Sequence, residues 1–459
     1  MKYFKISVTI LLLTLITSCS GREPNDIAYV VALGFDKAQN DNYLVTIQYA
    51  KPTQISGGAS QEGGKSGNEI VENLAVEAPD IHSAINTANH IVSKQFSLSH
   101  AKIIVFSGEV AREGIEDILE TFSRNQEIRP DIYLAVSQEG AKEYLYDVKP
   151  VFEVNPARYY QLIYENNNSS GVPKNTGLDF YFRQTGKIRD NAVPLAGVIE
   201  TKEESEGQSG GESSQSGGGQ SGGQGSQSGG GQSGGQGSQS GGGQSGGQEE
   251  KNQNQEQGNS HEINSGFEFK VKDYIAGQVG VNEKNKSQTM GMVIFKGTKA
   301  VFEAGSYDTA IYKMLSGDFK NGYITLKSDT DKPVTVMAEQ KRMPKISVDV
   351  KKKKIDIKIY LESDLYSMPA DYIDESDIEE FEQTAQNEIN KACTKFIDDV
   401  IKKRDVDILG FMSHARRKCL TNEQFYKLRD EIMNYEMNVD TVFHIRRMGL
   451  TIKESGGNK

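Results

Sequence analysis

Cys19 is the residue whose type and position most directly indicate chemistry. It follows a basic start, an apolar stretch over residues 6–16 and the small residues Thr17 and Ser18. This order is typical of a signal peptide that is cut just before the cysteine. A helix needs about 20 apolar residues to span a bilayer, so this shorter stretch favours a cleaved signal over a spanning helix. The thiol of Cys19 would then be the first side chain of the mature chain, where it can be alkylated.

The four residues Ile16-Thr17-Ser18-Cys19 resemble the bacterial lipobox. The resemblance implies a signal peptide over 1–18, cleavage between Ser18 and Cys19, and S-diacylglycerol plus N-acyl groups on Cys19. Two or more acyl chains give stable membrane anchoring, whereas one chain gives only marginal binding. We therefore expect a chain anchored to the outer face of the cell membrane. The alternative is a plain secreted protein whose cysteine merely lies near the cleavage site.

The remaining residues that could react or bind metal show no pattern that requires a reactive or metal-binding site. Cys393 and Cys419 could pair in an exported protein or remain as small buried residues. No histidine has a second one at the four-residue spacing that places two ligands on one helix face. The six histidines are His82, His90, His100, His261, His414 and His444. We predict no metal site and no cofactor.

Acidic residues are the other candidates for chemistry. Asp371, Asp374, Glu375 and Asp377 lack the ligand order and the central glycine of an EF-hand loop. Carboxylates at a helix start are expected in any case, because they offset the positive end of the helix dipole. The chain carries no nucleophile elbow, Walker loop or dinucleotide fingerprint in its predicted folded parts. We predict that it is not an enzyme; a hydrolase is the alternative, because paired carboxylates need only meet in space.

Charge and composition narrow the class of partner. The formal net charge is -11, with 52 basic and 63 acidic residues, and cleavage of the signal would remove two lysines. Such a chain is a poor nucleic-acid binder and has no polybasic hold on anionic lipid. We therefore expect no nucleic acid among its partners.

A low-complexity segment divides the chain. Residues 201–262 are almost wholly Gly, Ser, Gln and Glu, and the unit GGGQSGGQGSQS at 217–228 recurs at 229–240. Because the unit has no apolar residue, we expect it to be disordered. The predicted domains are then 19–200 and 263–459. Strand-like runs at 193–199 and 290–295 leave two alternatives for the insert: the cap of a hairpin within one domain, or an interdomain linker.

The segments on either side of the insert predict different mixtures of helix and strand. Residues 27–35 and 43–49 predict a hairpin, and 103–106 and 132–136 predict short buried strands. Asp80 can cap a helix whose apolar residues recur at helical spacing up to Val92, and a second amphipathic helix is predicted over 115–122. This part is mixed α/β.

The segment after the insert predicts an antiparallel sheet with long helices. Alternation over 346–350 and 355–361 predicts a hairpin with one buried face, and Lys351 to Lys354 form its turn. A capping box of Ser376 and Glu379 would open a long helix, and a closing strand is predicted over 439–452. The predicted fold class is α+β with several domains. The lysine run is interpreted as a solvated turn; a phosphate or lipid-headgroup patch is the alternative.

Several segments, in order, resemble the Ger(x)C family, the lipoprotein C subunits of spore germinant receptors. Before the insert they are 26–37 (DIAYVVALGFDK), 43–48, 100–106 (HAKIIVF), 114–115 and 123–130 (SRNQEIRP). Beyond it they are 290–296 (MGMVIFK), 405–411 (DVDILGF) and 448–450. None is a catalytic motif. The Gly/Ser/Gln insert departs from the family pattern, in which a short variable loop lies at this place.

The resemblance implies a lipid-anchored, non-enzymatic subunit on the outer face of the spore inner membrane. It would assemble with membrane-spanning A and B germinant receptor subunits and contribute to nutrient-triggered germination. The site residue that carries over is Cys19, for lipid. An extracytoplasmic solute-binding lipoprotein of a transporter is the alternative, although such a protein would show two similar lobes.

Overall fold

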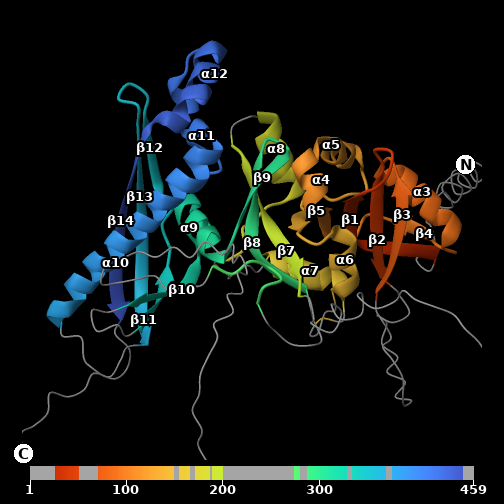
Figure 1. The fold of residues 1–459 in the computed structure, drawn as a ribbon, viewed down its shortest axis with the longest axis horizontal. Coiled ribbons are helices and arrows are strands. Elements are labelled where there is room, and N and C mark those ends of the chain that lie inside the picture. Colours follow the sequence, from red (N-terminus) through yellow and green to blue (C-terminus); the bar gives the residue numbers. More distant parts are fainter. Residues whose placement is uncertain are drawn as a thin grey trace, which may run out of the picture. The chain divides into compact units, whose positions relative to one another are not determined.

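The structure is a computed structural model that describes part of the chain (Figure 1). The described residues are 26–50, 71–148, 153, 155–165, 171–186, 189–199, 273–279, 287–327, 333–367 and 375–447. The predicted signal peptide, Cys19 and the 201–262 insert lie outside these ranges. Within them, helices and strands both contribute heavily, and the predicted α+β class is confirmed.

The first sheet has nine strands among the described residues, in the order β3-β2-β1-β5-β6-β7-β8-β9, with β4 paired to β1. Pairing is parallel from β1 through β5 and β6 to β7, and antiparallel towards both edges. The strands are β1 (Ile27–Lys37), β2 (Tyr43–Ala50), β3 (Val71–Ala78), β4 (Gln95–Ser97), β5 (Ile103–Ser107), β6 (Tyr133–Ser137), β7 (Asn191–Val198), β8 (Ser287–Lys296) and β9 (Lys299–Ala304). The predicted hairpin over 27–49 is the β1–β2 pair.

Helices cover both faces of this sheet. The helices are α3 (Ile81–Ile91), α4 (Gly108–Glu113), α5 (Glu116–Arg124), α6 (Ala141–Asp147), α7 (Pro156–Glu165) and α8 (Gly177–Gly186). Residues of α3, α4, α5 and α8 pack with Ile104 and Phe106 of β5, whereas residues of α6 and α7 pack with Ile103 and Val105. Because both faces are covered, every residue of β5 is buried. This is why the central strands are continuous apolar runs.

The first sheet continues on the far side of the insert. β7 and β8 are antiparallel neighbours, with Val193 opposite Val293. The insert therefore connects two adjacent strands, as in the hairpin alternative. β8 and β9 belong to this sheet although they follow residue 263, so the sequence boundary placed there does not coincide with a sheet boundary. The physical reason is that β8 hydrogen-bonds to the open edge of β7.

The second sheet is mostly antiparallel and has helices packed on it. Its strands are β10 (Asn321–Lys327), β11 (Pro333–Glu339), β12 (Lys345–Asp349), β13 (Lys354–Ser367) and β14 (Glu436–Arg447). Their order is β10-β11-β13-β12, and β14 pairs with β13 in parallel. The predicted hairpin is the β12–β13 pair, with Val348 opposite Ile355, and the predicted closing strand is β14.

The helices of this region include the long helix that its apolar stripe predicts. They are α9 (Ser306–Ser316), α10 (Glu375–Phe396), a π-helix η2 (Ile397–Lys402), α11 (Phe411–Ala415), the short η3 (Arg416–Lys418), α12 (Asn422–Glu431) and η4 (Ile432–Asn434). The α10 residues Ala385, Ile389 and Phe396 are buried in one core with β13. Within the described residues, no helix is both long and apolar enough to cross a membrane.

Candidate functional site

The residues singled out in the sequence do not converge on one site in the described structure. Cys19 and the acidic stretch at 371–374 lie outside the described residues. Cys393 and Cys419 are both free, and burial raises the pKa of the Cys393 thiol to about 12. Among the described His, Cys, Asp and Glu residues, no group of three or more is placed to hold a metal ion.

One buried polar cluster in the described structure was not singled out in the sequence. We call it the turn cluster: Arg189, Asp190, Gly297 and Asp407. The Asp190 carboxylate accepts hydrogen bonds from the backbone N–H of Gly297 at 3.0 Å and of Asp407 at 2.8 Å. The backbone N–H of Asp190 donates in return to the Asp407 carbonyl at 3.0 Å. These bonds join the strand before the insert to two turns after it.

Arg189 and Asp407 connect this cluster to the elements that pack on the second sheet. Arg189 donates from Nε to the Ile408 carbonyl at 2.6 Å and from Nη2 to the Tyr312 hydroxyl on α9 at 3.0 Å. Asp407 accepts from the backbone N–H groups of Phe411 at 2.7 Å and Met412 at 2.9 Å, the first residues of α11. The turn cluster therefore fixes α9, α11 and β7 to one another.

Burial dominates the electrostatics of the turn cluster. It raises the pKa of Asp407 to about 6 and that of Asp190 above its ordinary value, against the hydrogen bonds that favour the charged forms. The nearby Arg189 guanidinium lowers the pKa of Asp407. Each carboxylate is thus occupied by backbone donors, which is the arrangement of a structural cap.

A second buried polar network lies on the α6–α7 face of the first sheet. Tyr160 donates to the side-chain oxygen of Gln48 at 2.7 Å, and Gln48 donates to the Leu145 carbonyl at 2.8 Å. The hydroxyls of Tyr144 and Tyr164 lie 3.4 Å and 3.3 Å from Thr289 Oγ1 of β8. These hydroxyls hold α6 and α7 against strands from both sides of the insert. Burial raises the pKa of all three tyrosines, so they stay neutral.

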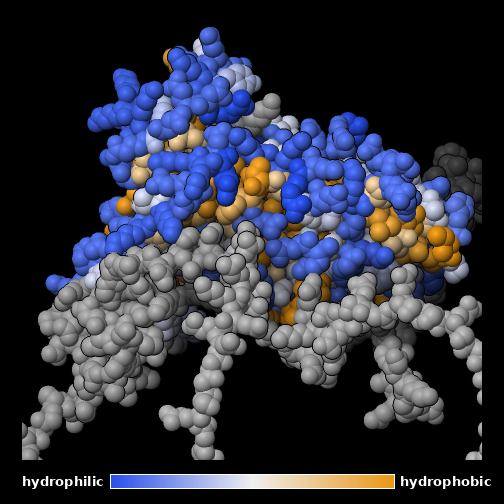
Figure 2. Space-filling view, viewed as in Figure 1, coloured by the Kyte–Doolittle hydropathy of each residue, from blue (hydrophilic) through white to orange (hydrophobic). Residues whose placement is uncertain are grey.

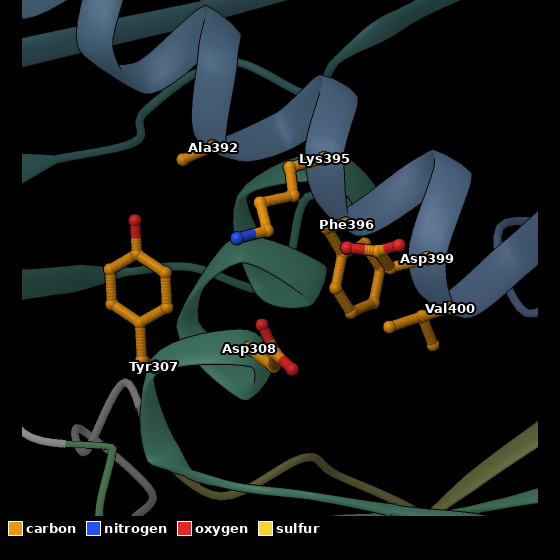
Figure 3. A pocket seen from close by; sticks show the side chains of 7 residues that line it. All are labelled: Tyr307, Asp308, Ala392, Lys395, Phe396, Asp399 and Val400. Atoms are coloured by element: carbon orange, nitrogen blue, oxygen red, sulfur yellow. The ribbon is translucent and has the colours of Figure 1, made fainter. Parts of the chain in front are cut away.

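A small cavity lies where α9 meets α10 and η2. The cavity has a volume of about 20 Å³, and Figure 3 shows Lys395 extending between Tyr307 on one side and Asp308 and Asp399 on the other. Burial and the neighbouring Asp273 raise the pKa of Asp308 to about 7, while Lys395 opposes the shift. Small-molecule sites are usually of several hundred Å³, so this cavity is too small to hold a nutrient.

A buried lysine on the same helix also escaped the sequence analysis. Lys313 of α9 is buried, and its ammonium group donates to the Val172 carbonyl at 3.1 Å. Burial lowers its pKa to about 8. Lys313 lies among the apolar residues of an amphipathic helix, and no local pattern in the sequence distinguishes it from an exposed lysine. The bond ties α9 to the segment that follows α7.

The two halves joined by the turn cluster each match a family model. Residues 20–198 match "Spore germination protein N-terminal domain", and residues 290–449 match "Spore germination B3/ GerAC like, C-terminal". The described fold is thus that of a spore germination protein built from two family domains. The chain belongs to the Ger(x)C family.

The chain is also similar to individual proteins. The chain is 28% identical to "Spore germination protein KC" of Bacillus subtilis (strain 168) over 123 residues. This alignment covers 27% of this chain and 30% of that protein. The alignment therefore spans less than a third of that relative. Among solved structures, "Crystal Structure of the GerBC protein" matches with a TM-score of 0.42 and 14% identity, covering 90% of this chain and 96% of that one.

Proposed function

We propose that this chain is a lipid-anchored, non-enzymatic subunit of a spore germinant receptor complex. It would be held by Cys19 on the outer face of the spore inner membrane and would assemble with membrane-spanning A and B subunits. The observation that carries the proposal is the pair of family matches over 20–198 and 290–449. The lipobox-like sequence directly before the first of them supports the anchor.

The polar clusters of the described structure support a non-enzymatic role. The carboxylates of Asp190 and Asp407 are occupied by backbone N–H donors, and the hydroxyl of Tyr160 by Gln48. A catalytic base or nucleophile needs an accessible group aimed at a substrate. In these clusters the polar groups instead hold helices and turns in place. The chain would then act through the surfaces that it presents beside the membrane, where anchoring raises the effective concentration for partner binding.

The anchor is tested by replacing the cysteine. Cys19→Ala should abolish incorporation of labelled fatty acid and slow nutrient-triggered germination, because the chain is no longer held at the membrane. Cys419→Ala is the matched control; it changes a partly exposed cysteine outside the lipobox and should keep both lipid labelling and germination. Unchanged lipid incorporation in Cys19→Ala would contradict the anchor.

Receptor membership is tested separately from anchoring. Affinity purification of the chain from detergent-solubilised spore membranes should recover membrane-spanning A and B subunits. Recovery of the lipidated chain alone, and from growing cells rather than spores, would contradict membership and favour the solute-binding alternative. The two tests are independent, because a chain can be lipidated without joining a receptor.

A further inference from the structure

The lipid anchor lies close in sequence to the first described strand. β1 begins at Ile27, eight residues after Cys19. Because a fully extended chain covers at most about 3.6 Å per residue, the anchored cysteine lies within about 29 Å of Ile27. A bilayer that holds the acyl chains must therefore pass close to the end of the first sheet at which β1 begins.

The elements at that end of the sheet are α3 and β4. β4 pairs with β1 in parallel, with Ile27 opposite Gln95 and Ala28 opposite Phe96. β4 follows the end of α3 after only three residues, so the last turn of α3 lies near the start of β1. We call residues 90–95, which include Ile91 at the end of α3, the α3–β4 corner.

The α3–β4 corner presents an apolar side chain to the outside. The buried side chains of α3, which pack on the first sheet, are those of Ile81, Ala84 and Ala88. Ile91, at the end of the helix, is 62% exposed. Val92 is partly buried and packs against the same core. Figure 2 shows hydrophobic residues gathered over the end of the molecule where α3 and β4 lie.

One exposed isoleucine is ordinary in a soluble protein, so the case for Ile91 rests on where it lies relative to the anchor. Leu420, between η3 and α12, is even more exposed at 91%. It lies beside Arg416, Arg417 and Lys418, but far along the chain from the lipid. Ile91 ends α3, which leads directly into β4, the strand paired with the start of β1. Ile91 is therefore linked through β4 to the strand that the anchor leads into, and Leu420 has no such link.

Charge at this end of the first sheet is mixed rather than strongly basic. Lys94 and His90 flank Ile91, while further along this end Arg129 pairs with Asp131, and Glu127 accepts a hydrogen bond from the backbone N–H of Leu98. A long lysine side chain such as that of Lys94 can keep its ammonium among headgroups while its stem lies on apolar surface. Apolar contact next to the tether, rather than attraction to anionic lipid, would set the orientation.

We propose that the α3–β4 corner is the surface of this protein that contacts the bilayer, with Ile91 entering the boundary between headgroups and acyl chains. The occupant is the phospholipid bilayer that carries the Cys19 anchor, so the inference rests on the proposed anchoring. Side chains of interfacial elements enter that boundary by about 5–10 Å. The contact would give the anchored chain one fixed face towards the membrane and leave the second sheet free for partner subunits.

The absence of tryptophan from the chain makes a direct test possible. Ile91→Trp and Leu420→Trp each introduce a single emitter at an exposed apolar position. The full-length lipidated variants are reconstituted into vesicles of phosphatidylethanolamine and phosphatidylglycerol with brominated acyl chains. We expect the emission of Ile91→Trp to shift to the blue and to be quenched several-fold more strongly than that of Leu420→Trp. Lowering the phosphatidylglycerol content should change the quenching little.

The outcomes separate this inference from the anchor itself. Vesicle flotation shows whether the protein is anchored, and cooperative thermal unfolding shows that each variant is folded. An Ile91→Trp variant that floats with the vesicles but emits as it does in water would overturn the orientation and leave the anchor intact. Stronger quenching of Leu420→Trp would place the basic segment between η3 and α12 on the membrane instead and overturn the proposal. A chain that fails to float contradicts the anchoring on which the proposal rests.

Discussion

The two sheets bury their apolar side chains in different ways. The first carries helices on both faces, so that β5 and β6 are buried at every residue. The second has its buried side chains on the face towards α9 and α10, and β14 alternates between buried and exposed positions. Parallel strands require covered faces because their crossover helices lie on the sheet, whereas antiparallel strands tolerate one solvated face. The difference shows why the strands of the first sheet are apolar runs in the sequence and those of the second sheet alternate.

Their buried polar groups differ as well. The α6–α7 face of the first sheet contains neutral groups, the tyrosine hydroxyls with Gln48 and Thr289. The second contains buried ionisable groups, namely Asp308, Lys313 and Asp407, each with a shifted pKa. Neutral networks are insensitive to pH near neutrality, but buried acids and amines are not. Sensitivity to pH should therefore concentrate in the second region.

The largest effect is expected where the two regions are joined. Asp407→Ala removes the acceptor for two buried backbone N–H groups at the start of α11, and should lower the free energy of unfolding by about 3 kcal/mol. Chemical denaturation measures the loss, and hydrogen exchange should rise around both α11 and the start of β7. Asp405→Asn is the control, because asparagine tolerates the left-handed backbone of this residue. Its exposed pair with Lys296 should contribute less than about 1 kcal/mol. Equal losses in the two variants would contradict the role of the turn cluster.

A matched set of Val→Ala changes tests the contrast between the sheets directly. Val105 of β5 and Val136 of β6 point to opposite faces, yet both are buried. Each substitution should cost about 2 kcal/mol, because two methyl groups leave a packed core. Val442 of β14 is 37% exposed, and its replacement should cost less than about 0.5 kcal/mol. A small loss at either Val105 or Val136 would show that one face of the first sheet is not tightly packed.

The sequence predicts most of the local structure because side-chain period is a local property. The stripe of Phe381, Ala385 and Ile389 identifies α10, and the alternation through Val348 and Ile355 identifies the β12–β13 hairpin. The side chain of Asp80 caps α3 as its position predicts, accepting hydrogen bonds from the backbone N–H groups of His82 and Ser83. In each case the residues that define the element are neighbours along the chain.

The sequence does not predict what depends on distant partners. Nothing local states that β8 will pair with β7 across the insert, because the pairing is decided by an edge far away in the chain. Asp190 and Asp407 likewise resemble ordinary surface acids beside apolar runs. Their burial follows only when the segment before β7 meets two turns of the second family domain, which supply the backbone donors. The one available signal was the position of Asp407 within a segment that resembles the family.

The pH response of the second region is expected to centre on Asp308. With its pKa raised to about 7, the folded chain keeps a proton that the unfolded chain loses near pH 4. Stability from this group is full below about pH 4 and falls as pH rises towards 7. Asp308→Asn should remove that fall and stabilise the protein by about 1–2 kcal/mol at pH 8. Denaturation midpoints across pH 4–8 measure it.

A second variant, at Lys395, should shift the pH at which stability falls rather than remove the fall. Its ammonium group lowers the pKa of Asp308, so Lys395→Met should move the fall in stability to higher pH. Hydrogen exchange followed across the same pH range should change around α9 and η2 and remain constant around the tyrosine network of the first sheet. A profile that is identical in wild type and Asp308→Asn would show that Asp308 does not titrate in this range.

The smallest effect is expected from the insert, although it interrupts the first sheet. Residues 205–258 contain no apolar side chain, so their deletion removes nothing that could pack in a core. Deleting them should leave the β7–β8 pairing intact and, by lowering the entropy of loop closure, stabilise the first region by no more than about 1 kcal/mol. Thermal unfolding with one cooperative transition is expected. Loss of cooperativity would show that the insert supports the pairing of β8, because the second family domain enters the sheet through that strand.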